Sequence, residues 1–394
     1  MRRKKRVLVI AESSTAYGRK IARGIAQYVQ ERGHWYVHIE DRGVFEIPHI
    51  VLDGWDGDGI ITRTVNAQLS LMLKKCNCPI VELMGYGKKV SVEVRADEEK
   101  MSELCVNHFL ERGFKNLAFY SFGRSWWIDR RCELFLNAAT EKHFNPLRLS
   151  SISESDATAS HPVWKKEYEK TLTQWLTTLP SQTGLIAASD SQAMRVLQSC
   201  QKIGIKVPEE IAVLGIDNDV HLCNLLTPQL SSLDQNVVQI GYTAARLLDL
   251  KMSRRKIPTL PILIPPLYVV TRRSTDVMAI DDPDIAAALH FIGEHAIQGI
   301  RVSDVVNETN LSKSTLIRQF RKILGRSPKD EIIRVCLNHA QRLLIHTNLP
   351  IHVVAQRSGY QSVEYFVTMF HKRTGKSPLQ FRHKHQMSDY VSDE

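Results

Sequence analysis

Residues 320–328 read FRKILGRSP and residues 370–378 read FHKRTGKSP, so one phrase occurs twice, 50 residues apart. The copies share a Phe, a Lys, a Gly and a Ser-Pro pair. A Gly after a run of helical period ends a helix, and Ser-Pro starts the next one, with Ser as N-cap and Pro at the first helical position. Each copy therefore predicts a junction between two helices.

The residues before each copy predict a helix, a short turn and a second, capped helix. Residues 302–325 read VSDVVNETNLSKSTLIRQFRKILG, with Ser312 as the expected cap, and residues 351–375 read IHVVAQRSGYQSVEYFVTMFHKRTG, with Gly359 in the turn and Ser362 as cap. The apolar residues expected on the inner faces are Leu316, Phe320, Ile323, Leu324, Phe366 and Phe370. This is the helix-turn-helix pattern, and residues 328–348 predict one long helix between the two units.

The net charge of +10 is concentrated in the region of the repeat. Residues 284–385 hold 15 Lys and Arg against 7 Asp and Glu, a net charge of +8, whereas the rest of the chain holds 37 against 35. A basic excess confined to one region usually faces a polyanion such as nucleic acid. The alternative is a soluble surface that is rich in Lys and Arg.

This region resembles the AraC-type family of transcription regulators. The resemblance rests on the tandem units, on LIRQFRKILGRSP (316–328) and on RSGYQSVEYFVTMFHKRTGKSPLQFR (357–382). It implies double-stranded DNA as partner, with the second helix of each unit in the major groove. The base-reading positions that it implies are Ser314, Ile317, Arg318, Val363, Glu364 and Thr368. The positions that it implies at or near phosphate are Lys313, Arg321, Lys322, His371, Lys372 and Arg373.

Side-chain chemistry gives some of these positions a role. Arg318 suits the O6 and N7 acceptors of guanine, and Glu364 can accept from the N4 amino group of cytosine. Thr368 departs from the Arg that is often found there in the family, which puts base reading by the second unit in doubt. For a single charge such as Arg321, the alternative is a solvated helix face.

The first two-thirds of the chain predict an α/β structure. From Arg6 to Thr275, short apolar runs such as RVLVIAE (6–12) alternate with amphipathic helices, and LYVVTRRST (267–275) predicts a last strand. Such alternation is typical of parallel sheets covered on both faces, and the length allows two of them. The expected organisation is therefore an α/β domain with room for two sheets (6–275), a linker (276–284), an all-α tandem helix-turn-helix domain (285–385) and a frayed tail (386–394).

Two carboxylates follow predicted strands in this part of the chain. Asp190 comes after IAAS and Asp217 comes after LGI. Ligands of open α/β sheets bind outside the carboxyl ends of the strands, and paired carboxylates suit the hydroxyl groups of a sugar. The alternative for Asp190 is that it or Ser191 caps the next helix.

This part resembles the LacI-type ligand-binding domain, which is similar to periplasmic sugar-binding proteins, and the resemblance implies a two-lobed α/β fold of the periplasmic-binding-protein type (type I) over residues 6–275. The resemblance rests on RADEEKMSELCVNHFLERGFKNLAFYS (95–121), GIKVPEEIAVLGID (204–217), PQLSSLDQ (228–235) and the terminal RRST. The ligand-binding residues that it implies are Tyr17, Arg19, Asp97, Trp127, Arg130, Asp190, Asp217 and Gln235, with Arg131 as an alternative to Arg130. For the aromatic residues beside Arg130, the alternative is packing at a hinge.

A sensor domain followed by AraC-type units resembles regulators of the xylose-operon type. The likeness extends to YGRKIARGIAQY (17–28), WLTTLPSQTGLIA (175–187) and HFIGEHAIQGIRVSDV (290–305). It implies a sugar effector, xylose or a related pentose, a homodimer, and RNA polymerase as a partner if the protein activates. A repressor of the same architecture that answers to another sugar remains the alternative.

Other function classes find little support in the sequence. We expect no enzyme, because no Walker loop, nucleophile elbow, zinc-protease or dinucleotide motif occurs. The seven cysteines have no metal spacing, so we expect neither metal nor cofactor. The apolar run at residues 7–11 is too short for a signal sequence and no stretch reaches membrane-spanning length. We therefore expect a cytoplasmic protein without a membrane partner and disfavour a transport protein.

Overall fold

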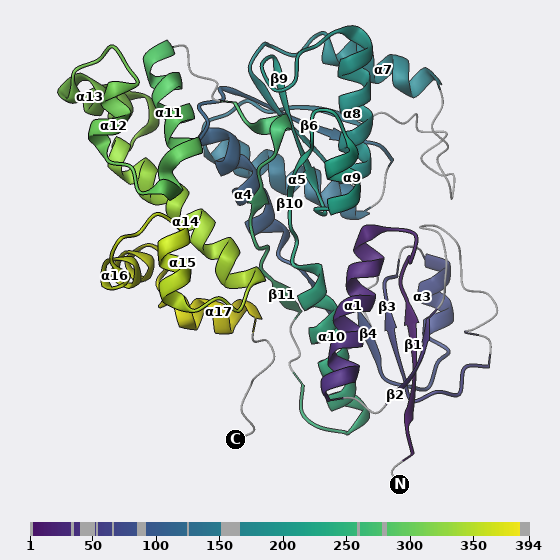
Figure 1. Ribbon diagram of the computed structural model, residues 1–394. Helices are drawn as coiled ribbons and strands as arrows, with labels where there is room; N and C mark the ends of the chain where they lie inside the picture. Colours follow the sequence, from purple (N-terminus) through teal and green to yellow (C-terminus); the bar gives the residue numbers. More distant parts are fainter. Residues whose placement is uncertain are drawn as a thin grey trace. The chain divides into compact units, whose positions relative to one another are not determined.

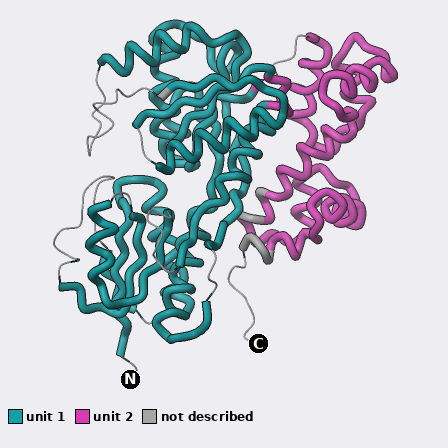
Figure 2. The backbone as a smooth tube through the Cα atoms, turned by 180° about the vertical axis from the view of Figure 1, so that it is seen from behind, with its two compact units in different colours: residues 1–109, 115–276 teal, residues 110–114, 277–394 magenta. Residues whose placement is uncertain are grey.

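The computed structural model describes residues 3–32, 35–39, 52, 54–64, 67–84, 92–123, 126–150, 166–257, 261–277 and 282–386. The chain divides into two compact units, which we call the α/β unit (residues 1–109 and 115–276) and the helical unit (residues 110–114 and 277–394) (Figure 2). Residues 278–281 of the predicted linker and 387–394 of the predicted tail lie outside the described residues. No helix among the described residues is long and apolar enough to span a membrane.

The first lobe of the α/β unit is built on a parallel sheet in the order β2-β1-β3-β4 (Figure 1). Its strands are β1 (Lys5–Ile10), β2 (Trp35–Ile39), β3 (Gly59–Thr62) and β4 (Ile80–Glu82). Alternate strand residues face opposite sides, so Leu8 and Ile10 pack on α3 (Ala67–Leu73) while Gly59 lies against Leu248 of α10 (Val237–Met252). Helix α1 (Ala16–Glu31) packs along α10.

The second lobe is built on a six-stranded sheet in the order β12-β10-β9-β8-β6-β7, in which only β12 is antiparallel. Its strands are β6 (Asn116–Ser121), β7 (Leu147–Ser150), β8 (Thr183–Ala187), β9 (Ile211–Ile216), β10 (Ser231–Leu233) and β12 (Val269–Val270). Helices α7 (Lys166–Leu176) and α8 (Asp190–Ile203) cover one face, and α4 (Glu98–Leu110) and α5 (Trp126–Glu141) supply Phe109 and Phe135 to the other. Short α9 (Val220–Leu225) follows β9.

The strand predicted over residues 267–275 is shorter than the pattern suggested. It contains β12 and then a single 3₁₀ turn, Arg273–Thr275. The Ser274 hydroxyl donates to the carbonyl of Val213 at 2.6 Å and the Thr275 hydroxyl donates to Ser231 at 2.7 Å. These side-chain hydrogen bonds hold the backbone in a turn, because they compete with ladder bonds.

A two-stranded parallel sheet, β5 (Val94–Ala96) with β11 (Ile262–Ile264), carries the chain between the lobes. The chain enters the second lobe after β5, returns to the first lobe as α10, and reaches β12 after β11. Leu110, the last residue of α4, and residues 111–114 after it belong to the helical unit, although the sequence pattern assigned them to the sensor domain.

The helical unit consists of two helix-turn-helix pairs around one long helix (Figure 1). Its helices are α11 (Pro283–His295), α12 (Val302–Asn307), α13 (Lys313–Leu324), α14 (Pro328–His346), α15 (Ile351–Arg357), α16 (Val363–Thr374) and α17 (Pro378–Gln386), with a 3₁₀ turn at Ala296–Gln298. The second helices of the pairs are α13 and α16. Four of the expected inner-face residues, Leu316, Phe320, Phe366 and Phe370, are fully buried in one hydrophobic core, as the sequence predicted.

Candidate functional site

Polar side chains meet at the carboxyl ends of the strands in the second lobe. Asp217 directly follows β9, and Gln235 stands two residues after β10. The side-chain amide of Gln235 donates to Asp217 Oδ1 at 2.5 Å, and its Oε1 accepts from the guanidinium of Arg131 at 3.4 Å. Carboxylate, amide and guanidinium thus present both hydrogen-bond donors and acceptors at one point.

Arg131 is held in place by several partners. Its guanidinium donates to both carboxylate oxygens of Glu98 at 2.9 and 2.7 Å and to the carbonyl of Ala188 at 2.7 Å. It also lies over the ring of Trp127, 5.2 Å from the centroid. Arg130 is exposed one residue earlier on α5, so the structure places Arg131 in this group and Arg130 outside it. Helical periodicity gives adjacent residues different faces, and only tertiary packing selects one of them.

The strand ends of the first lobe carry a second buried charge pair. Arg63 directly follows β3 and donates to Glu12, two residues after β1, at 2.7 Å. Its guanidinium lies 4.9 Å from the ring centroid of Tyr17. Burial raises the pKa of the Tyr17 hydroxyl to about 12, so it stays protonated and able to donate. Beside this pair, Glu82 accepts from the amide and hydroxyl of Thr64, and burial raises the pKa of Glu82 to about 7.

Basic residues of α1 reach across to the second lobe. The Lys20 ammonium donates to the carbonyls of Asp217 at 2.6 Å and Asn218 at 3.0 Å. Arg19 is exposed and its guanidinium lies 3.8 Å from Asp219 Oδ2. The contacts of Lys20 join the two lobes at the residue pair that follows β9.

The backbone and charge of Asp217 are both unusual. Its φ angle is +123°, a region that non-glycine residues rarely adopt and that often marks functional sites. Burial raises the pKa of the Asp217 carboxyl to about 6, against the opposing effect of Arg131, Lys20 and Arg63. Lys20 and Arg63 belong to the first lobe and Arg131 to the second, so basic residues of both lobes act on the Asp217 carboxyl.

Two other predicted ligand residues make structural contacts. Asp190 is almost fully buried and accepts from the Ser232 hydroxyl at 2.5 Å and the Asp219 amide at 2.7 Å, while Ser189 caps α8. Burial, followed by the charge of Asp217, raises the pKa of Asp190 to about 8. Asp97 accepts from the Lys100 amide at 3.2 Å at the start of α4. The Asp190 side chain therefore fixes the loop after β9.

The sequence interpretation missed Glu12, Lys20, Arg63 and Glu98. Glu12 and Arg63 stand at the ends of RVLVIAE and GDGIITR, where the rule for ligand sites in open α/β sheets would have found them. Glu98 and Lys20 lie on helices whose pattern carries no such signal. The assembled group can bind a small polyhydroxylated ligand, since it combines fixed charges, amide groups and the aromatic rings of Tyr17 and Trp127.

The first helix-turn-helix pair presents a basic, exposed second helix. Ser312 caps α13 by accepting from the Thr315 amide at 3.3 Å. Of the residues predicted to contact DNA on this helix, Ile317 is half-buried and the others are exposed, namely Lys313, Ser314, Arg318 and Arg321. Ile323, expected on the inner face, is 38 % exposed in the last turn of α13, so that expectation was wrong for this residue.

The second pair differs at the same positions. Ser362 caps α16 and also donates to Glu364 Oε2 at 2.7 Å, and this hydrogen bond lowers the pKa of Glu364. The Thr368 hydroxyl donates to the carbonyl of Glu364 at 2.9 Å. Val363 is half-buried against the core, whereas His371 and Lys372 are exposed. Tyr365, which the sequence interpretation did not name, is 45 % exposed on this helix.

The parts of the chain match known families. Residues 6–92 match the XylR N-terminal domain, residues 106–275 a periplasmic binding protein-like domain, and residues 305–384 a helix-turn-helix domain.

Whole-chain relatives agree with this arrangement. The chain is 32 % identical over 387 residues to the xylose operon regulatory protein of Escherichia coli K12, covering 96 % of both chains. It is 30 % identical to the protein of that name from Haemophilus influenzae, covering 96 % of this chain and 98 % of the other. The solved structure of the xylose-binding transcription activator xylR matches with a TM-score of 0.62 and 30 % identity, over 97 % of this chain and 99 % of that one. The chain belongs to the family of xylose operon regulatory proteins, DNA-binding transcription regulators with a helix-turn-helix domain and a periplasmic-binding-protein-like domain.

Proposed function

We propose that this chain is a transcription activator that binds xylose between the two lobes of its α/β unit and DNA through α13 and α16. The observation that carries the proposal is the group of Arg131, Asp217 and Gln235, which lies at strand ends of a chain that also holds two helix-turn-helix pairs. The full-length relatives that are named for the xylose operon support xylose as the effector.

The chemistry of the group suits a pentose. Each sugar hydroxyl donates one hydrogen bond and accepts others, so Asp217 offers acceptors, Arg131 offers donors and Gln235 offers both. The partners of Arg131 hold it in one orientation before a ligand arrives, which lowers the entropic cost of binding. Sugar binding at contacts that join the lobes favours one lobe arrangement, and this is how the effector shifts the protein between states.

The finer parts of the proposal follow from these roles. We call α13 and α16 the reading helices. A homodimer presents two copies of this pair, in which Lys313 and Lys372, among others, approach phosphate. The bound activator recruits RNA polymerase. A regulator of this kind performs no catalytic step and works in the cytoplasm, where it reaches DNA. On the sugar side we propose Tyr17, Trp127, Arg131, Asp217 and Gln235 as ligand contacts.

The test is xylose-dependent thermal stabilisation of the full chain with single substitutions. Asp217→Asn removes the charged acceptor, and we expect it to weaken xylose binding at least about tenfold, the usual cost of a lost charged hydrogen bond. Asp129→Asn makes the same chemical change at an exposed residue of α5 and serves as control. Equal stabilisation of both variants by xylose would place the effector site elsewhere. The double change at Asp190 and Asp217 is a poorer test, because Asp190 supports the fold.

A further inference from the structure

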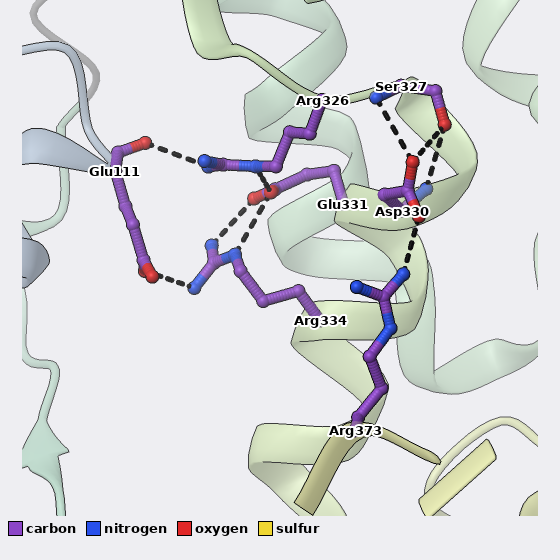
Figure 3. A network of polar contacts seen from close by, with 7 residues as sticks. All are labelled: Glu111, Arg326, Ser327, Asp330, Glu331, Arg334 and Arg373. Carbon is purple, nitrogen blue, oxygen red and sulfur yellow. Dashed lines mark hydrogen bonds and ion pairs between the residues drawn. The ribbon is translucent and has the colours of Figure 1, made fainter.

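A short segment after α4 is part of the helical unit. Residues 110–114 belong to that unit, whereas α4 itself, apart from its last residue, belongs to the α/β unit. Within the helical unit, Arg334 Nη1 donates to Glu111 Oε2 at 2.8 Å, and Arg326 Nη2 donates to the Glu111 carbonyl at 3.0 Å (Figure 3). Glu111 therefore receives one contact through its side chain and another through its backbone.

The arginine pair that holds Glu111 is itself fixed by a buried carboxylate. Glu331 is 1 % exposed and accepts from Arg326 Nε at 2.6 Å and from Arg334 Nη2 at 2.6 Å (Figure 3). Burial opposes ionisation of Glu331, but hydrogen bonds and charge from Arg334 and Arg326 outweigh it, so its pKa is lowered. Two guanidinium groups against one buried carboxylate leave a positive charge, which the Glu111 carboxylate balances.

This network lies where both reading helices end. Arg326 follows Gly325, the C-cap of α13. Arg373, in the last turn of α16, donates to Asp330 Oδ1 at 2.6 Å, and Asp330 forms the capping box of α14 with Ser327 (Figure 3). Residues in the first two turns of α14 therefore contact Glu111, Arg326 directly after α13, and Arg373 at the end of α16.

The other end of α4 reaches the candidate effector site. Glu98 is its first residue and makes the bidentate contact with Arg131 described above. The helix has 13 residues, so it spans about 20 Å at 1.5 Å per residue. Phe109, which lies against Gly184 of β8, packs this helix on the second-lobe sheet, and Cys105 on the same helix is buried, so we treat α4 as a stiff element.

We propose that α4 relays the state of the effector site to the DNA-reading helices through Glu111. This inference rests on the proposed function, in which xylose contacts Arg131 and the helical unit binds DNA. A ligand that shifts Arg131 moves its partner Glu98, the displacement passes along the packed helix, and Glu111 transmits it to Arg326 and Arg334. Because these arginines sit at the junction of α13, α14 and α16, both reading helices respond together.

The experiment measures the coupling between sugar and DNA in the full-length protein. A DNA site is first selected from a random library by the wild-type chain, and its Kd is measured with and without D-xylose at fixed salt. For the wild type we expect a ratio of about 5–150, the usual range of allosteric coupling. For Glu111→Ala we expect the ratio to fall at least threefold toward 1, while the Kd for xylose without DNA stays within about twofold of the wild-type value.

A matched control variant and two contrasting results distinguish a failure of the relay from a failure of the proposed function. Glu103→Ala makes the same change at an exposed residue of α4 and should keep the wild-type ratio. By linkage, DNA must change the xylose Kd by the same factor, which gives an independent reading of the coupling. A coupled wild type with an equally coupled Glu111→Ala variant would overturn the relay alone. A wild type that binds DNA but shows no coupling to xylose would overturn the relay together with the proposed function.

Discussion

The two helix-turn-helix pairs repeat the same buried and capping residues 50 positions apart, yet they expose different side chains. Phe320 and Phe370 are fully buried at equivalent positions. Arg318 on α13 corresponds to Thr368 on α16, and the exposed Lys313 corresponds to the half-buried Val363. The repeated residues therefore maintain the fold of each pair, whereas the divergent ones give α13 and α16 different exposed surfaces.

The divergence also changes the charge that each helix carries. Helix α13 has no acidic residue and four basic ones, Lys313, Arg318, Arg321 and Lys322. None of the four forms an ion pair among the described residues. On α16, Glu364 adds a negative charge and Arg373 is paired with Asp330. Since phosphate attraction follows the free positive charge, we expect the first pair to supply more of the salt-dependent affinity.

The largest effect is expected from the buried phenylalanines. Phe320→Ala and Phe370→Ala each leave a cavity in the shared core, and we expect each to lower the free energy of unfolding of the helical unit by about 3–5 kcal/mol. Hydrogen exchange of α13 to α17 in the full chain measures this. Tyr365→Ala, at a 45 % exposed side chain, should cost far less. A large cost at only one phenylalanine would break the equivalence of the two pairs.

Base reading is the next comparison. Arg318→Ala should weaken binding to the selected DNA site by about 1–3 kcal/mol, roughly 5- to 150-fold, more than it weakens binding to random DNA. Thr368→Ala should have a smaller effect, because its hydroxyl bonds to the carbonyl of Glu364. Gel-shift titrations at fixed salt measure both. Equal losses on selected and random DNA would reduce Arg318 to a phosphate contact.

The helix-ending glycines provide a third comparison. Gly325 and Gly375 have φ angles of +67° and +73°, and an added Cβ would meet no atom within 4 Å at either. Alanine should therefore cost only the backbone penalty, about 1 kcal/mol at each position. Gly293, in α11 and also without neighbours within 4 Å, has no positive φ, so Gly293→Ala should stabilise slightly. Thermal unfolding measures all three, and opposite signs at Gly325 and Gly375 would contradict the prediction.

The smallest expected effect is a difference between two capping boxes in how their contribution to stability depends on pH. Ser327 pairs with Asp330 at the start of α14, and Ser377 pairs with Gln380 at the start of α17. Hydrogen bonds from Ser327, and then Arg373, lower the pKa of Asp330. A lowered pKa stabilises the fold above the unfolded pKa of about 4 and loses that effect as the pH falls through the folded value.

We therefore expect Asp330→Asn to cost about 0.5 kcal/mol at neutral pH and progressively less in acid. Gln380→Ala should cost a similar amount at every pH, since an amide does not titrate. Thermal unfolding of both variants between pH 7 and pH 3 measures the difference. A pH-independent cost of Asp330→Asn would mean that its charge is not what stabilises the cap.

Most of the helical unit could be predicted from the sequence because its signals are local. Ser312, Ser362, Gly325 and Gly375 act within their own helices, so their roles follow from positions a few residues apart. The position of Asp217 directly after a strand could also be predicted locally, and its role as a ligand contact stays a prediction. The choice of Arg131 over Arg130 could not be predicted, because it depends on Glu98 and Gln235, 33 and 104 residues away.

By itself, the sequence determined the order of the elements, the two helix-turn-helix pairs and the strand ends at which we propose a ligand site. Periodicity, capping residues and strand-end carboxylates depend on residues that are close together in the sequence, so they can be recognised without the tertiary structure. Only the tertiary structure decided that Asp190 supports a loop, that Arg63 pairs with Glu12, and that residues 110–114 join the helical unit. Those facts depend on contacts between distant segments, whose free energy is set by burial and charge in the folded chain.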